Sequence, residues 1–183
     1  MRSSVWVISG PAGVGKGTLV ARLKELHPDI VVSVSATTRS PRPGEVNGQS
    51  YYFVDDAEFD RLIATGELLE WAEVHGAARY GTPRGPVLAA VDSGHTVILE
   101  IDLQGAEQVR HTMPQARRIF IAPPSWEELV RRLKTRGTET PDQQRRRLET
   151  AKHELASAPE FDFVVVNREV DTAVQDLVAL IGL

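Results

Sequence analysis

The chain has 183 residues, of which 42% are hydrophobic and 25% are charged, and its formal net charge is −4. This length suits one domain with one buried core, and the composition excludes a disordered or low-complexity chain. The negative net charge argues against nucleic acid and anionic membranes as partners. The apolar runs, such as 30–32 and 163–166, are far shorter than the roughly 18 residues of a spanning helix.

Two further features concern the compartment in which the protein works. Residues 1–8 lack the long apolar stretch and the small-residue cleavage site of a secretory signal peptide. The sequence contains no cysteine, which fits a reducing compartment and excludes disulfides and thiolate metal sites. We therefore expect a cytoplasmic protein without a membrane partner.

The elements predicted in chain order alternate between strands and helices. A β-branched run at 5–9 precedes a glycine-rich turn and a helical pattern whose apolar face carries Leu19, Leu23 and Leu26. Helical stretches separate several further buried-strand runs, at 96–101, 119–121 and 163–166. This alternation predicts an α/β fold with a three-layer core, in which helices cover both faces of a parallel sheet.

Two stretches interrupt the alternation and are predicted to be insertions on the core. The first, 34–85, is rich in turn residues and polar aromatic residues and contains an amphipathic helix near 56–65. The second, 125–156, is expected to be a mobile lid of two short helices rich in arginine. We predict a single domain over 1–183 whose core consists of about 1–33, 86–124 and 157–183.

The helix ends of the second insertion carry their own signals. Ser125 has capping-box spacing to Glu128, and the first helix is expected to stop at Gly137. The next helix should start with Thr140 as its cap and Pro141 at its first position.

A phosphate-binding loop is predicted between the first strand and the first helix. A GxxxxGK motif in this context supplies inward-facing backbone N–H groups and a helix N-terminus, both of which bind phosphate oxygens. The residues of this loop that are predicted to bind ATP are Gly10, Pro11, Ala12, Gly13, Val14, Gly15 and Lys16, together with Gly17 and Thr18 directly after it. Lys16 has the length to reach the β- and γ-phosphates of a nucleotide.

One position departs from the general loop motif. Gly17 stands where a serine or threonine would ligate magnesium, and Thr18 follows one residue later. We therefore expect Mg²⁺ to be held mainly by nucleotide phosphates and water, which suits its reluctance to dehydrate.

Beyond the loop, the sequence resembles the guanylate kinase family over nearly its whole length. The strongest match is the segment 33–45, Ser-Val-Ser-Ala-Thr-Thr-Arg-Ser-Pro-Arg-Pro-Gly-Glu. Shorter motifs follow in order at 46–48, 51–53, 67–72, 80–82, 99–105, 122–125 and 136–139. The resemblance implies a P-loop kinase in which 34–85 is a GMP-binding lobe, and an enzyme that uses ATP to phosphorylate GMP and dGMP.

The resemblance also implies where GMP binds. It assigns the phosphate of GMP to Arg39, Arg42, Tyr51 and Tyr80, and guanidinium forks and phenol donors suit a phosphate dianion. It assigns the guanine to Glu70, Ser35, Thr82 and Asp102. Guanine presents two adjacent donors that one carboxylate can accept together, although Glu70 taken alone is typical of a solvated helix-end charge.

Glu100 and Asp102 stand two apart on a predicted strand, so both should point to one face at its carboxyl end, where ligands bind in open α/β sheets. The resemblance places Asp102 near the guanine and associates Glu100 with the hydrated magnesium, an ion that we also expect near Thr18.

The arginines of the lid have two interpretations. Composition alone favours a solvated helix face balanced by neighbouring glutamates. The resemblance instead makes Arg132, Arg136 and Arg147 clamps for ATP phosphates, and it places Asn167 at the border of the adenine.

The implied mechanism is direct in-line transfer of the γ-phosphate, without a covalent intermediate. Lys16, Arg39, Arg132, Arg136 and Mg²⁺ would supply the positive field around the transferring group. The rival hypotheses are a non-catalytic guanylate-kinase-like interaction module and a P-loop kinase for another small phosphorylated substrate. The oligomeric state cannot be derived from the sequence.

Overall fold

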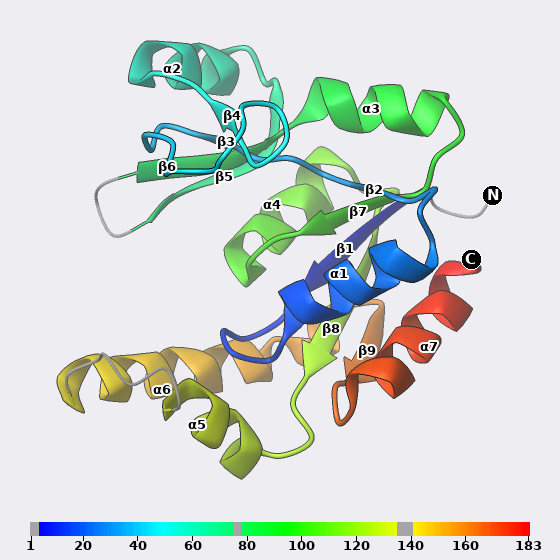
Figure 1. Cartoon of the computed structure of the whole chain (residues 1–183). Helices are drawn as coiled ribbons and strands as arrows, with labels where there is room; N and C mark the ends of the chain where they lie inside the picture. The colour runs from blue at the N-terminus through cyan, green and yellow to red at the C-terminus, as the bar shows by residue number, and fades with distance from the viewer. Residues whose placement is uncertain (1–3, 75–77, 135–140) are drawn as a thin grey trace.

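The structure is a computed structural model that describes residues 4–74, 78–134 and 141–183 (Figure 1). In chain order its elements are β1 (Val5–Ser9), α1 (Lys16–Leu26), β2 (Val31–Val32), β3 (Ala36–Thr37), β4 (Tyr52–Phe53), α2 (Asp56–Ala64), β5 (Leu68–Val74), β6 (Ala78–Pro83), α3 (Arg84–Asp92), β7 (Val97–Glu100), α4 (Leu103–Thr112), β8 (Arg117–Ala122), α5 (Trp126–Lys134), α6 (Pro141–Ala156), the 3₁₀ turn η1 (Ala158–Glu160), β9 (Phe163–Val166) and α7 (Val170–Ile181).

The main sheet confirms the predicted parallel architecture. Its strand order is β2-β7-β1-β8-β9, and every neighbouring pair is parallel. The central strand β1 is buried along its whole length, which explains its unbroken run of apolar residues. The strands expected at 96–101, 119–121 and 163–166 are β7, β8 and β9.

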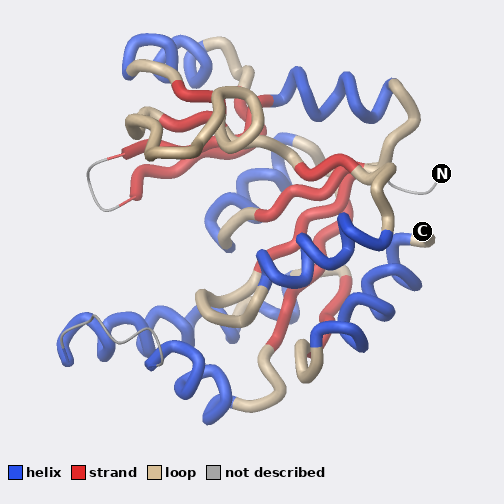
Figure 2. The backbone as a smooth tube through the Cα atoms, in the orientation of Figure 1, coloured by secondary structure: helices blue, strands red, loops and turns tan. Residues whose placement is uncertain are grey.

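Helices cover both faces of this sheet, so the expected three-layer α/β core is confirmed (Figure 2). On one face Leu19 and Leu23 of α1 and Leu177 of α7 pack on alternate residues of the strands. On the other face Val109 of α4 and Val87 of α3 do the same. Leu26, expected on the buried face of α1, is instead 50% exposed because it lies in the last turn of the helix, beside an open hollow.

A second, four-stranded sheet lies apart from the first, in the order β4-β3-β6-β5 (Figure 1). Helix α2, which the sequence predicts, packs on it through Phe59 and Leu62. The strands of this sheet are short or carry polar residues, so sequence periodicity does not reveal them. This sheet and the pair α5–α6 lie on opposite flanks of the core at the end where α1 begins (Figure 1).

Helices α5 and α6 pack on each other through a small apolar cluster that includes Leu129, Leu133 and Ala151. Ser125 Oγ accepts a hydrogen bond of 3.2 Å from Glu128 N, which is one half of the expected capping box. The Glu128 carboxylate pairs with Arg131 and Arg132. Gly137 and Thr140, the predicted stop and cap, lie outside the described residues.

The prediction that Glu100 and Asp102 share one strand is wrong. Strand β7 ends at Glu100, and Asp102 is the N-cap of α4, where its Oδ1 accepts a hydrogen bond of 2.7 Å from Gly105 N. An aspartate side chain satisfies the unpaired N–H groups of a helix start, and here that demand outweighs the continuation of the strand.

Among the residues that the structure describes, no helix has the length and apolar character to cross a membrane.

Candidate active site

The loop between β1 and α1 forms an open cradle. Gly15, the N-cap of α1, has φ +96° and no side chain, so the N–H groups of the first helical turn face outward without a side-chain partner from the cap. A side chain at this position would also place its Cβ 2.8 Å from Asn167 Nδ2. The geometry is that of an anion site at a helix N-terminus.

Lys16 lies across this loop. Its Nζ donates to the carbonyl oxygens of Gly10, at 2.6 Å, and Pro11, at 3.2 Å. Burial lowers the pKa of Lys16, while the nearby carboxylates of Glu154, Glu100 and Asp102 act in the opposite direction. Carboxylates from two distant parts of the chain, residues 100–102 and Glu154, therefore act on the ammonium group.

A hollow of about 420 Å³ opens over the loop. It is lined by Gly13, Gly15, Lys16, Gly17, Thr18, Glu100 and Arg132. Six of these seven residues belong to the predicted nucleotide site, and the seventh, Glu100, was associated with the metal. The structure therefore brings the ATP-side residues together, although their roles stay predictions.

Two residues from distant elements hold the loop in place. Asn167 Nδ2 donates to the Val14 carbonyl oxygen at 2.8 Å, and Arg132 Nη1 donates to the same oxygen at 3.2 Å. Asn167 is only 3% exposed. The amide of Asn167, predicted at the adenine, here bonds to the loop backbone.

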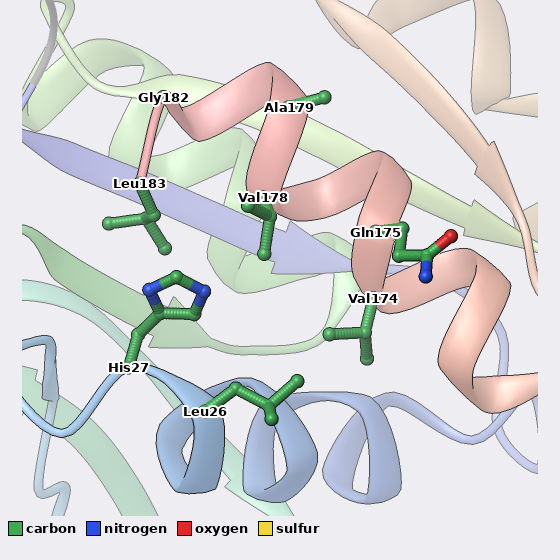
Figure 3. Close-up of a pocket in the computed structure, with 8 residues that line it drawn as sticks. All are labelled: Leu26, His27, Val174, Gln175, Val178, Ala179, Gly182 and Leu183. Carbon is green, nitrogen blue, oxygen red and sulfur yellow. The ribbon is translucent and has the colours of Figure 1, made fainter.

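A larger hollow of about 650 Å³ lies at the opposite end of α1 from Lys16, between the last turn of α1 and α7 (Figure 3). Leu26, Val174, Val178 and Leu183 line much of it, and His27 is its one titratable side chain. It offers no cluster of cations for phosphate groups. We therefore place the candidate site at the smaller hollow over the loop.

The fit of magnesium to the site rests on Glu100 and Thr18. The ideal Cβ of Gly17 would lie 3.4 Å from Glu100 Oε1, so the carboxylate stands directly over the start of α1. Glu100 is exposed at the mouth of the hollow. Partial loss of hydration raises the pKa of its carboxyl group, and the positive charge of Lys16 opposes that shift. One carboxylate and one hydroxyl beside a phosphate cradle fit an ion that keeps phosphate and water ligands.

At the second sheet, three of the residues predicted for the GMP phosphate lie together: one follows β3, one precedes β4 and one is in β6. Arg39 Nε donates to Tyr80 Oη at 3.2 Å, and the guanidinium lies 5.3 Å from the centroid of the Tyr51 ring. The rings of Tyr51 and Tyr80 meet edge to face at 5.8 Å. Arg42, the fourth predicted residue, is exposed.

Sequence reasoning gave Glu45 no role, yet it organises this group. Its carboxylate accepts two hydrogen bonds from the Arg39 guanidinium, at 2.8 and 3.0 Å, and one from Arg42 N at 2.7 Å. These bonds raise the pKa of Arg39 further and lower that of Glu45. The signal was local: Pro43-Gly44, with Gly44 at φ +87° and Glu45 N bonded to Arg42 O, is a turn that folds Glu45 back.

Two of the residues predicted for guanine, Thr82 and Asp102, act on a third, Glu70 of β5. This carboxylate is 7% exposed, and Thr82 Oγ1 donates to its Oε1 at 2.6 Å. Burial raises the pKa of Glu70 to about 7; the Thr82 hydroxyl opposes the shift and Asp102 adds to it. Ser35 is half-buried beside this sheet, and its carbonyl oxygen accepts from Tyr52 N at 2.9 Å.

Asp102 links the two halves of the site. Its charge acts on Glu70 in the second sheet and on Lys16 in the phosphate loop. Asp102 is therefore within electrostatic reach of both the base side and the phosphate side.

Sequence reasoning also missed Glu154. From α6 its Oε2 accepts a long hydrogen bond of 3.4 Å from Ala12 N, 142 residues away, and burial raises its pKa while the Ala12 N–H and Lys16 oppose that shift. No local pattern around Glu154 indicated this contact. Arg147 is half-buried on α6, and Arg136 lies outside the described residues.

Fold and site together define a P-loop kinase, in which a glycine-rich cradle with a lysine opens a parallel α/β sheet. The structure of a shikimate kinase from Bacteroides thetaiotaomicron has this fold, with a TM-score of 0.52 over 98% of each chain, although the two sequences are only 13% identical. At that identity the likeness concerns the fold alone.

The family follows from closer comparisons. A family model described as guanylate kinase matches residues 2–182. A guanylate kinase from Cutibacterium acnes is 63% identical over 98% of this chain and 90% of its own, and one from Leifsonia xyli subsp. xyli is 62% identical over 98% and 70%. The crystal structure of guanylate kinase from Anaplasma phagocytophilum is 37% identical, covers 97% of this chain and 84% of its own, and has a TM-score of 0.73. The chain belongs to the guanylate kinase family.

Proposed function

We propose that this enzyme transfers the γ-phosphate of ATP to GMP and dGMP. The observation that carries the proposal is the buried Glu70 carboxylate, which lies between Thr82 and Gly105 and within electrostatic reach of Asp102. Burying a carboxylate without a cation costs free energy, so such a group is retained where a ligand supplies the missing donors. Guanine supplies two, the N1–H and the exocyclic amine, on one edge.

The neighbouring hydroxyls and carboxylate complete the proposed base site. Thr82 and Ser35 offer hydroxyl groups that donate to the guanine carbonyl or accept from its amine. Asp102 is proposed as a further acceptor, with one oxygen engaged in the cap of α4. Adenine presents no pair of adjacent donors, so the set selects against it.

At the other end of the nucleotide, Arg39, Arg42, Tyr51 and Tyr80 are proposed to bind the GMP phosphate. The proximity of Arg39, Tyr51 and Tyr80 supports this assignment. Glu45 already fixes the plane of the Arg39 guanidinium, so little side-chain entropy remains to be lost when phosphate binds.

The proposed chemistry is in-line attack of a GMP phosphate oxygen on the γ-phosphorus of ATP. That oxygen is anionic at neutral pH, so no general base is required. Lys16, Arg39, Arg132 and Arg136 bring the two anions together and offset the charge that spreads over the transferring group. Mg²⁺, held by phosphates and water beside Thr18 and Glu100, would supply further positive charge when bound.

We also propose the division of the chain that this chemistry requires. The GMP-binding lobe comprises about 34–85, the lid about 125–156, and the core about 1–33, 86–124 and 157–183. The second sheet and the α5–α6 pair, each with its own apolar cluster, support this division. ATP and GMP are metabolites of the cytoplasm, where we propose that the enzyme works.

The rival hypothesis of a non-catalytic interaction module has no observation in its favour. A binding module needs neither a phosphate cradle nor a lysine across it, whereas both are present here. The relatives compared with this chain are named as kinases.

A coupled assay of ADP release tests the proposal. The purified protein is given MgATP with GMP, dGMP, IMP, AMP, CMP or UMP. We expect turnover with GMP and dGMP and little with AMP. Failure of GMP to stimulate ADP release above the rate with ATP alone would contradict the proposal.

A further inference from the structure

Gly105, the third residue of α4, lies against the carboxylate of Glu70. An ideal Cβ at this position would be 2.8 Å from Glu70 Oε2, 3.2 Å from its Cδ and 3.3 Å from its Cγ. Carbon and oxygen atoms do not approach so closely without a bond, so the space of the missing side chain is the space that Glu70 occupies.

The backbone of α4 does not itself require a glycine here. Gly105 lies within helix α4 and its φ is not positive, so residues with a side chain can adopt the same backbone conformation. In a helix, glycine is roughly 0.5–1 kcal/mol less favourable than alanine. The glycine therefore has a local cost, and the packing against Glu70 is the feature that explains it.

On its other side the Glu70 carboxylate is equally confined. Thr82 Oγ1 holds Oε1 at 2.6 Å, and the side chain is 7% exposed. Glu70 and Thr82 are directly paired across β5 and β6, so this contact is fixed by the register of the sheet. The carboxylate is clamped between a hydroxyl from the second sheet and the bare backbone of α4.

We infer that Gly105 is a positioning residue for guanine recognition, because its missing side chain lets Glu70 hold both carboxylate oxygens towards the base. The inference rests on the proposed function. Gly105 touches no substrate atom in this role; it acts through Glu70. A methyl group would push the far end of a flexible side chain, so the carboxylate would turn away and the fold would remain.

The chemical consequence is selective. A carboxylate that accepts from both N1–H and the exocyclic amine of guanine loses one of these bonds when it is displaced by several tenths of an ångström. IMP carries the N1–H but not the exocyclic amine. We take the displaced oxygen, Oε2, as the acceptor of the exocyclic amine, so displacement of Glu70 costs more with GMP than with IMP. The ATP site at the phosphate loop is unaffected.

The test compares two glycine-to-alanine variants in helices. Gly105→Ala should lower kcat/KM for GMP by about tenfold or more, mainly through KM, and should change kcat/KM for IMP by less than about threefold. The KM for ATP should stay the same. Gly85→Ala in α3 is the matched control, since nothing lies within 4 Å of its added methyl group, and it should leave all these values unchanged.

A double-mutant cycle with Glu70→Ala separates this role from a merely structural one. Once the carboxylate is gone, the added methyl group has nothing to displace, so Gly105→Ala should cause no further loss with GMP. The same cycle is measured by thermal unfolding. If Gly105→Ala alone lowers Tm, Glu70→Ala should restore it.

Three outcomes would overturn the inference: an unchanged ratio of GMP to IMP efficiency in Gly105→Ala, a loss with GMP that adds in full to that of Glu70→Ala, or a loss of Tm that Glu70→Ala does not relieve. Each is distinct from failure of the proposed function, in which the unmodified enzyme itself would not use GMP.

Discussion

Glu70 and Thr82 face each other across β5 and β6, and the Thr82 hydroxyl donates a 2.6 Å hydrogen bond to the Glu70 carboxylate in a buried setting. The hydrogen bond attaches Glu70, the residue proposed to recognise guanine, to strand β6 of the second sheet. It fixes one carboxylate oxygen without neutralising the charge, which leaves the group dependent on a ligand for further donors.

Replacement of Glu70 by alanine should remove guanine recognition. We expect kcat/KM for GMP to fall by about 3 kcal/mol, roughly a hundredfold, because a site built around hydrogen bonds suffers when they are lost. The KM for ATP should barely move. Steady-state kinetics with each substrate varied in turn measures both, and near-normal GMP kinetics in Glu70→Ala would refute the assignment.

Replacement of Glu70 by glutamine should make the protein more stable above pH 7. The folded protein binds a proton at Glu70 more tightly than the unfolded chain, because burial raises its pKa from 4.5 to about 7. Ionisation therefore destabilises the fold progressively between these two values, by an amount on the order of 3 kcal/mol. Glutamine carries no such charge. The gain in unfolding free energy of Glu70→Gln over the unmodified protein should therefore be absent near pH 4 and complete at pH 8.

Urea unfolding at both pH values measures this difference, with Glu67→Gln as the control. Glu67 pairs with Arg61, which lowers the pKa of that carboxyl, so its contribution is present above the unfolded pKa and is lost as the pH falls. Glu67→Gln should therefore gain no stability at pH 8. A Glu70→Gln variant that is equally stabilised at pH 4 and pH 8 would contradict the role of ionisation.

The two glycines at the start of α1 should respond differently to substitution. Gly17→Ser is expected to be tolerated, with a modest change in activity and an intact Mg²⁺ requirement, since its Cβ would make a close but sustainable contact of 3.4 Å with Glu100. Gly15→Ala should be far more harmful to ATP use. Its φ of +96° costs a residue with a Cβ roughly 1–2 kcal/mol, and the added atom would press on Asn167.

Titration of ATP and Mg²⁺ for both variants, with EDTA as the metal-free reference, checks this ranking. Activity that no longer needs Mg²⁺ in Gly17→Ser, or a Gly15→Ala enzyme with normal ATP kinetics, would be the contrary result.

Removal of the Asn167 amide should loosen the phosphate loop. Asn167→Ala deletes a buried hydrogen bond to the Val14 carbonyl, and we expect a loss of about 1–2 kcal/mol in unfolding free energy. The KM for ATP should rise while the KM for GMP stays constant, because the bond joins the phosphate loop to the residue after β9 and involves no strand of the second sheet. Equal increases in both KM values would show that the residue acts on the whole fold.

Closure of the enzyme should proceed in two steps. The cations proposed for phosphate come from opposite flanks of the core, Arg39 just after β3 of the second sheet and Arg132 on α5, and we expect substrates to enter between them (Figure 1). Each ligand can close its flank only through its higher affinity for the closed form; a shift from 1:99 to 99:1 requires roughly 5.5 kcal/mol.

Solution scattering of the free enzyme, the GMP complex and a bisubstrate-inhibitor complex should show stepwise compaction. Arg39→Ala should weaken the GMP step and leave the ATP step intact. Superimposable curves in all three states would rule out closure.

The sequence by itself determined the features that arise from neighbouring residues. Strand β1, the glycine cradle and the start of α1 follow from β-branched residues, GxxxxGK and helical periodicity, because these patterns act through the local backbone. The same holds for α2 and for the hydrogen bond from Glu128 N to Ser125. The resemblance to guanylate kinases rests on motifs spread along the chain, and it identified the family that the comparisons show.

Only the tertiary structure decided which distant residues meet. Gly105 gives space to Glu70, Asn167 holds Val14, and Glu154 reaches Ala12, all across separations that no local pattern describes. Asp102 was misplaced for a different, local reason: period-two spacing cannot tell a strand residue from the cap of the next helix. These contacts depend on how the helices pack against two sheets, and packing is a property of the whole chain rather than of any segment.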